Sequence, residues 1–210
     1  MIRNAENKVI VTVKTKYIKN FTDIMKVAQL QNQNTVKAED IVNIVGEIVS
    51  IPNSVSKDRS HEGFTTKDIQ VGDIAIFSHS IIYDWYQKEH NGELLYKNLI
   101  SIQGKEYWTA DITKIYGVIR DEKTIMINGY VMATTFPEDL IVLAAKSKKV
   151  KGVKSSQVLY IGNPKENKKP ITAKEGDTIF YNPNVAIKYQ INNKPFIILQ
   201  QHHVLGKVYK

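Results

Sequence analysis

The sequence contains no cysteine, so the chain can form neither a disulfide nor a cysteine-ligated zinc site. No apolar run approaches the roughly 20 residues that a membrane-spanning helix needs. Residues 2–8 are mostly polar or charged, whereas a secretory signal needs about 7–15 consecutive apolar residues. These absences lead us to expect a cytoplasmic protein that does not act at a membrane.

Sequence signatures of catalysis and metal binding are also missing. The chain has no H-E-x-x-H, no phosphate-binding glycine loop and no G-x-S-x-G pattern. Its 5 histidines show no metal-ligand spacing with carboxylates, and the neighbours His202 and His203 would point to opposite faces of a strand. We therefore expect no catalytic residue, no metal site and no cofactor, and we interpret the chain as a protein that is not an enzyme.

Negative charge is scarce relative to positive charge. There are 29 Lys and Arg against 21 Asp and Glu, which gives a net charge of +8. The densest lysine cluster, residues 146–154, has no aromatic side chain on which a base could stack. We favour a solvated loop there over a polyanion contact and do not expect a nucleic-acid partner, although a basic nucleic-acid-binding β module stays open as an alternative.

The most informative feature that is present is a Gly-Asp pair followed by a β-branched and aromatic run. It occurs as V-G-D-I-A-I-F at residues 71–77 and again as E-G-D-T-I-F-Y at residues 175–181. Glycine accepts positive φ and aspartate bonds nearby backbone, so each pair predicts a tight turn that starts a strand. We interpret Asp73 and Asp177 as turn stabilisers, and the repetition suggests a duplicated module.

The rest of the chain follows the same order twice: strand, long polar segment, strand, loop, Gly-Asp strand, hairpin and closing strand. The sequence predicts a first domain at residues 1–118 and a second at residues 119–210. Its expected strands are 8–14, 46–51, 71–77 and 110–116 in the first copy, and 124–131, 157–163, 176–181, 195–199 and 204–208 in the second.

The first copy carries an insertion at about residues 81–102. Asn91-Gly92, between apolar-rich flanks, is a strong hairpin signal. The insertion also holds Trp85 and several tyrosines. We interpret these rings as the core of the hairpin, with a binding face as the alternative.

These landmarks resemble the GroES co-chaperonin family, whose members show a G-E-V strand, a V-G-D-x-V-x-F strand and a closing S-D-I-L-A strand. In the first copy the resemblance lies in Gly46-Glu47-Ile48-Val49, the 71–77 strand and Ala110-Asp111-Ile112. In the second copy it runs through Gln157-Val158-Leu159, the 176–182 turn and strand, and residues 197–205. The resemblance covers almost the whole chain as a tandem pair, an arrangement similar to the double co-chaperonin of chloroplasts.

The resemblance implies an all-β protein of two tandem, partly open GroES-like β-barrels, each with a long mobile loop. Members of the family form rings and cap a GroEL-type chaperonin through a short aliphatic motif in that loop; the chaperonin, and not the cap, binds nucleotide. The residues that correspond to this motif are Ile141, Val142, Leu143 and the adjacent Leu140 in the second copy, and Ile24, Met25 and Val27 in the first.

Some positions depart from the family. The first copy has its insertion and a longer loop, Glu175 precedes the second Gly-Asp pair, and His203 stands where the family favours Asp. The expected function is a co-chaperonin that assists protein folding as a homo-oligomeric ring. The alternative is a structural or assembly protein, for example a viral one, that uses the same pair of barrels without a chaperonin.

Overall fold

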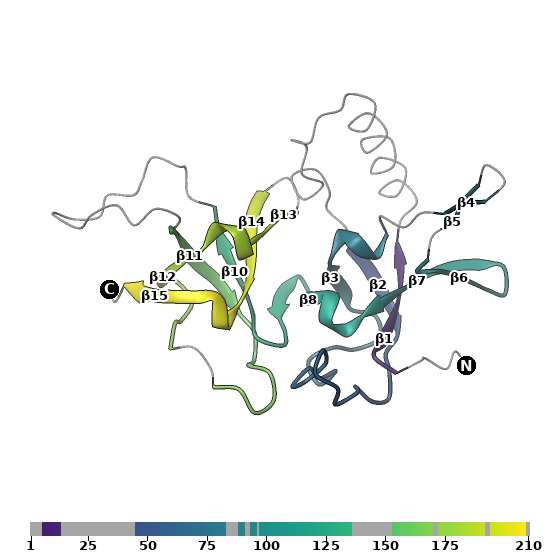
Figure 1. The fold of residues 1–210 in the computed structure, drawn as a ribbon, viewed down its shortest axis with the longest axis horizontal. Helices are drawn as coiled ribbons and strands as arrows, with labels where there is room; N and C mark the ends of the chain where they lie inside the picture. Colours follow the sequence, from purple (N-terminus) through teal and green to yellow (C-terminus); the bar gives the residue numbers. More distant parts are fainter. Residues whose placement is uncertain are drawn as a thin grey trace, which may run out of the picture.

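The computed structural model describes residues 6–13, 45–82, 88–90, 93–95, 97–135, 153–169, 172–191 and 194–208. These residues form strands and short 3₁₀ turns, without an α-helix, which confirms the all-β prediction (Figure 1). No helix within the described ranges is long and apolar enough to cross a membrane.

The first half of the chain forms a 7-stranded antiparallel sheet in the order β6-β7-β1-β2-β3-β8-β9. Its strands are β1 (Lys8–Val13), β2 (Val45–Ser50), β3 (Ile74–Phe77), β6 (Leu99–Ile102), β7 (Lys105–Asp111), β8 (Ile115–Arg120) and β9 (Lys123–Met126). The predicted insertion contains a further hairpin of β4 (Lys88–His90) and β5 (Glu93–Leu95), which pair on either side of Asn91-Gly92 and confirm that signal.

The second half forms a 6-stranded antiparallel sheet in the order β13-β14-β10-β11-β12-β15. Its strands are β10 (Tyr130–Thr134), β11 (Lys154–Ile161), β12 (Thr178–Tyr181), β13 (Ile187–Ile191), β14 (Lys194–Gln200) and β15 (Val204–Val208). When β13, β14, β10, β11, β12 and β15 are matched to β6, β7, β1, β2, β3 and β8, the two orders are identical. The first sheet adds only β9. The duplicated order of elements predicted from sequence is therefore present in the topology.

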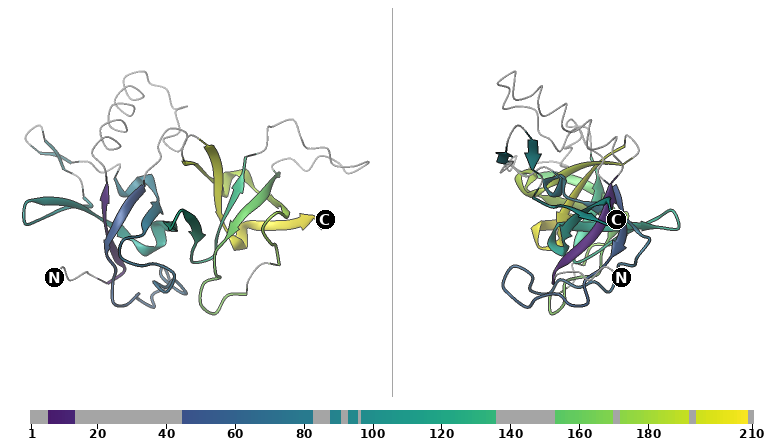
Figure 2. Two further views of the ribbon diagram at one scale, coloured as in Figure 1. Left: turned by 180° about the vertical axis from the view of Figure 1, so that it is seen from behind. Right: turned by 90° about the vertical axis from the view of Figure 1, so that its right-hand side faces the viewer.

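The two sheets lie side by side along the longest axis (Figure 2). Side chains of β10 and β14 pack in the apolar clusters of both halves. In β10, Tyr130 and Met132 join the apolar cluster of the first half, while Val131 and Ala133 join that of the second. In β14, Ile198 belongs to the first cluster and its neighbours to the second. Because successive side chains of a strand point to opposite faces, a strand between two cores is apolar at every position. This explains the unbroken apolar runs at these two strands.

One strand expected across residues 124–131 is divided in the structure. β9 ends at Met126 after pairing with β8, and β10 begins at Tyr130. Between them Asn128 (φ 49°) and Gly129 (φ 74°) adopt the left-handed region, so the chain turns where a continuous strand was expected. β9 thus extends the first sheet, and the predicted boundary between residues 118 and 119 falls inside β8.

The expected strand at residues 110–116 is also divided. A 3₁₀ turn, η3 (Ile112–Lys114), separates β7 from β8, because the Asp111 carboxylate accepts a hydrogen bond from the Thr113 amide at 3.0 Å. The equivalent turn in the second half is η5 (Gln201–His203), between β14 and β15. The period-two pattern was therefore correct on both sides of the turn and wrong at the turn itself.

Candidate functional site

The predicted chaperonin-contact residues lie outside the described residues. The first motif falls in segment 14–44 and the second in segment 136–152, so the contacts of their side chains stay a prediction. These residues are Ile24, Met25, Val27, Leu140, Ile141, Val142 and Leu143. The structure does describe the strand pairs that these two segments connect.

The two segments join equivalent pairs of strands. Segment 14–44 connects β1 to β2, where Val13 pairs with Gly46. Segment 136–152 lies between β10 and β11, where Ala133 pairs with Val158. In Figure 1 the ends of both strand pairs lie on the upper side of the sheets, and the loops that follow β2 and β11 lie on the lower side. The segments that contain the two aliphatic motifs therefore connect equivalent strand pairs, which end on the same side of the two sheets.

The two Gly-Asp turns have the same hydrogen bonds. Ile48 donates to the Asp73 carbonyl at 2.8 Å and accepts from the Gly72 amide at 2.8 Å. Val158 makes the same two bonds with Asp177 at 2.9 Å and Gly176 at 2.8 Å. Gly72 (φ 94°) and Gly176 (φ 87°) both need positive φ. The sequence repeat thus marks one backbone arrangement, built twice.

The aspartates of these turns act as structural acceptors, as predicted. Asp73, which is 3% exposed, accepts from the Gln70 amide at 2.7 Å and from Arg120 at 2.7 Å through both Nε and Nη2. Asp177 accepts from the Lys174 amide at 2.9 Å and from Lys207 at 3.2 Å. The Lys174 bond, followed by that of Lys207, lowers the pKa of Asp177. Both carboxylates therefore stabilise their turns by accepting hydrogen bonds.

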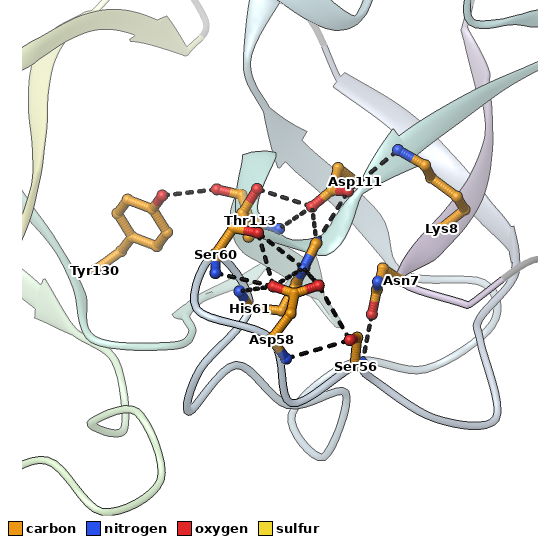
Figure 3. A network of polar contacts seen from close by, with 9 residues as sticks. All are labelled: Asn7, Lys8, Ser56, Asp58, Ser60, His61, Asp111, Thr113 and Tyr130. Carbon is orange, nitrogen blue, oxygen red and sulfur yellow. Dashed lines mark hydrogen bonds and ion pairs between the residues drawn. The ribbon is translucent and has the colours of Figure 1, made fainter.

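Sequence reasoning missed a polar network around His61 (Figure 3). The Nδ1 atom of His61 lies 2.9 Å from Asp58 Oδ1, and its Nε2 atom lies 3.1 Å from Asp111 Oδ1. Lys8 and Thr113 also donate to Asp111, at 3.1 and 2.8 Å. The signal in the sequence was the D-x-x-H spacing of Asp58 and His61, in the loop expected between the second strand and the Gly-Asp strand.

The hydrogen bonds of this network shift the pKa values of its imidazole and its two carboxylates. Burial disfavours the charged imidazole, but hydrogen bonds to Asp58 and Asp111 outweigh it and raise the pKa of His61. Hydrogen bonds from Ser60 and then His61 lower the pKa of Asp58. Burial opposes the same change at Asp111, where bonds from Thr113, His61 and Lys8 lower the pKa to about 2. Both ring nitrogens are engaged, so the imidazole serves as a clamp between two segments.

The loops that follow β2 and β11 contact each other and link the two halves. Glu166 donates its amide to the Gly63 carbonyl at 2.8 Å, and its carboxylate pairs with Lys67. Asn128 bonds both the amide and the carbonyl of Thr65, at 2.9 and 3.1 Å. These bonds, together with the shared apolar cluster, join the halves through both polar and apolar contacts.

His202 and His203 do not alternate across a strand, contrary to expectation. They lie in η5 with ring centroids 4.0 Å apart, because the chain turns there. Burial lowers the pKa of both rings, and Lys165 lowers it further. Within the described ranges, no three residues among His, Asp and Glu gather closely enough to hold a metal ion.

Comparison with known families adds a match in the second half. Residues 123–208, from β9 to β15, match the family model of the chaperonin 10 Kd subunit. No curated protein matches the chain by sequence. The matched range contains the complete second sheet and the second Gly-Asp turn. The second half of this chain is therefore similar to the chaperonin 10 family of co-chaperonins along nearly its whole length.

Proposed function

We propose that the chain is a co-chaperonin that closes the chamber of a GroEL-type chaperonin ring and assists protein folding without bond chemistry of its own. One observation carries this proposal: the two sheets share one strand order, and the second of them matches the chaperonin 10 Kd subunit. In each half, the segment with the aliphatic motif connects the equivalent strand pair. Each chain would thus offer two contacts to the chaperonin.

The small free energy of a single contact suits a lid that must bind the chaperonin and dissociate from it. Three aliphatic side chains buried in an apolar groove contribute about 5–9 kcal/mol, at roughly 1.5–3 kcal/mol each. Ordering six residues of a segment costs on the order of 6–12 kcal/mol. The net free energy of binding through one segment alone is therefore close to zero. Several segments in one assembly can raise the overall affinity by a factor of roughly 10²–10⁴. We infer that the functional form is a homo-oligomeric ring in the cytoplasm.

The test removes the aliphatic motif of the second half. The triple variant Ile141→Ala, Val142→Ala, Leu143→Ala should lose binding to a nucleotide-loaded GroEL-type ring, measured by native mass spectrometry, and keep its β-rich circular dichroism. Val71→Ala is the matched control, because Val71 is an aliphatic residue, 62% exposed, outside both segments. Unchanged binding of the triple variant would refute the proposed contact.

The first motif is tested separately. The variant Ile24→Ala, Met25→Ala, Val27→Ala should weaken chaperonin binding if both halves contribute, and leave it unchanged if only the second half does. Assembly of the wild-type chain into a closed particle without any affinity for the chaperonin would instead favour a structural or assembly protein.

A further inference from the structure

A pocket of about 420 Å³ lies beside the turn that begins the second half. The Gly129 turn, the loop after β11 and the η5 turn enclose it. The lining side chains that matter here are Lys165, Lys168, Lys169 and His202. The volume of the pocket lies within the range that is usual for small-molecule sites, which is roughly 300–1,000 Å³.

The backbone of this pocket is held firmly. Gly129 donates to the Asn163 carbonyl at 2.6 Å and accepts from the Gln201 amide at 2.7 Å. The Gln201 side chain donates to the Gly162 carbonyl at 2.7 Å. These bonds fix the three segments relative to one another, so the pocket is formed before any ligand arrives.

The first half offers an internal comparison, because the same three segments meet there. The Asn7 turn (φ 67°) matches Gly129 (φ 74°), and the Asn7 carbonyl accepts from Ile112 at 2.9 Å as Gly129 does from Gln201. In the first half this place is filled by the His61 side chain, 13% exposed and held by two aspartates (Figure 3). The His61 imidazole and its two carboxylate partners thus occupy this place in the first half.

The second half has the opposite chemistry at this place. The position of Asp111, directly before the 3₁₀ turn, is taken by Gln200, and the loop after β11 supplies lysines. The ammonium of Lys165 lies 3.9 Å from the centre of the Phe64 ring, which orients it. Burial and then the charge of Lys168 lower the pKa of Lys165. Cations are therefore gathered here at a cost that a bound anion would offset.

Few carboxylates are near enough to neutralise these cations. Glu62 lies 3.5 Å from Lys168, but their side chains are 63% and 56% exposed, so the pair is weak. Glu166 pairs with Lys67, away from the pocket. No ion pair of Lys165 or Lys169 is found among the residues that the structure describes.

We propose that this pocket binds the phosphate groups of an oligophosphate, either free or as part of a nucleotide. Several lysine ammonium groups around one open volume suit a ligand with several charged oxygens, since lysine binds phosphate as a point charge. A ligand with a single carboxylate would neutralise one of these ammonium groups and leave the repulsion among the others in place. This inference is independent of the proposed contact with a chaperonin.

The test is calorimetric titration of the full chain with inorganic tripolyphosphate and, separately, with ATP. Saturable binding that weakens at high salt is expected. Equal affinity for the two probes assigns the site to the phosphates alone, and tighter binding of ATP adds a contact to the nucleoside. Absence of saturable binding by either probe would overturn the proposal.

Variants localise the site. Lys168→Gln with Lys169→Gln should weaken tripolyphosphate binding by about tenfold or more, and both lysines are exposed, so folding should be unaffected. Lys105→Gln with Lys123→Gln removes the same charge from exposed positions elsewhere and should change affinity less than about twofold. Glu62→Gln should strengthen binding, because it removes the competing carboxylate of Lys168. Equal losses in the two double variants would refute the site.

Discussion

Arg120 in β8 binds Asp73, directly before β3, through two hydrogen bonds, each 2.7 Å long. The second half repeats this relationship with one bond of 3.2 Å from Lys207 to Asp177. Each cation also donates to the carbonyl at the equivalent loop position, Arg120 to Asp68 at 3.1 Å and Lys207 to Thr172 at 2.7 Å. The closing strand of each half is thus fastened to its Gly-Asp turn by one basic residue.

Arg120→Ala should lower the free energy of unfolding by about 3 kcal/mol, because it leaves the buried Asp73 carboxylate without its partner. Lys207→Ala should cost distinctly less, since Asp177 is more exposed and has a single bond to Lys207. Urea denaturation of both variants measures the two losses. Equal losses would show that the bidentate pair of Arg120 and Asp73 contributes no more to stability than the pair of Lys207 and Asp177.

Stability should depend on pH through the His61 network. The folded pKa of His61 is raised above its ordinary 6.5, so its contribution is present below pH 6.5 and is lost as the pH rises through the folded pKa. The pKa of Asp111 falls from 3.8 to about 2, so its contribution is present above pH 3.8 and is lost as the pH falls toward 2. The network should stabilise the fold most between these limits.

The measurement is the urea midpoint of the wild type minus that of His61→Gln across this pH range. The difference should shrink as the pH rises above 6.5. His202→Gln is the control of opposite sign: burial, followed by His203 and Lys165, lowers the pKa of His202, so protonating it costs stability. A difference for His61→Gln that does not change with pH would contradict the clamp.

Met132→Ala and Val131→Ala test whether the two halves unfold together. Met132, 1% exposed, packs in the first cluster, and its neighbour Val131, fully buried, packs in the second. The methionine truncation should cost about 2–5 kcal/mol, and both variants should shift one common transition. Two separate transitions, each sensitive to one variant, would show that the halves unfold independently.

Gly46→Ala should destabilise the β1–β2 pair. A Cβ atom at Gly46 would lie 2.2 Å from the Thr12 carbonyl oxygen, which is backbone and cannot move away alone. The expected cost is roughly 1–3 kcal/mol. Gly206→Ala is the control, because nothing lies within 4 Å of a Cβ atom there. A stable Gly46→Ala protein, judged by thermal unfolding, would argue against the close strand approach.

The sequence alone determined the local frame. Gly72 and Gly176 predicted two turns, because glycine itself tolerates the positive φ that each turn requires. The alternation of apolar and polar residues predicted strands on either side. The order of these signals, found twice, predicted the duplicated topology. It also indicated the family that the second half matches.

Only the tertiary structure decided how distant segments meet. His61 lies between Asp58 and Asp111, Asn128 holds Thr65, and the two faces of β10 pack in different cores, none of which follows from local periodicity. Such contacts depend on how the whole chain closes its loops, whereas turns and strands depend on neighbours in sequence. For this reason the repeat could be read from the sequence, while the clamp of the first half and the cationic pocket of the second could not.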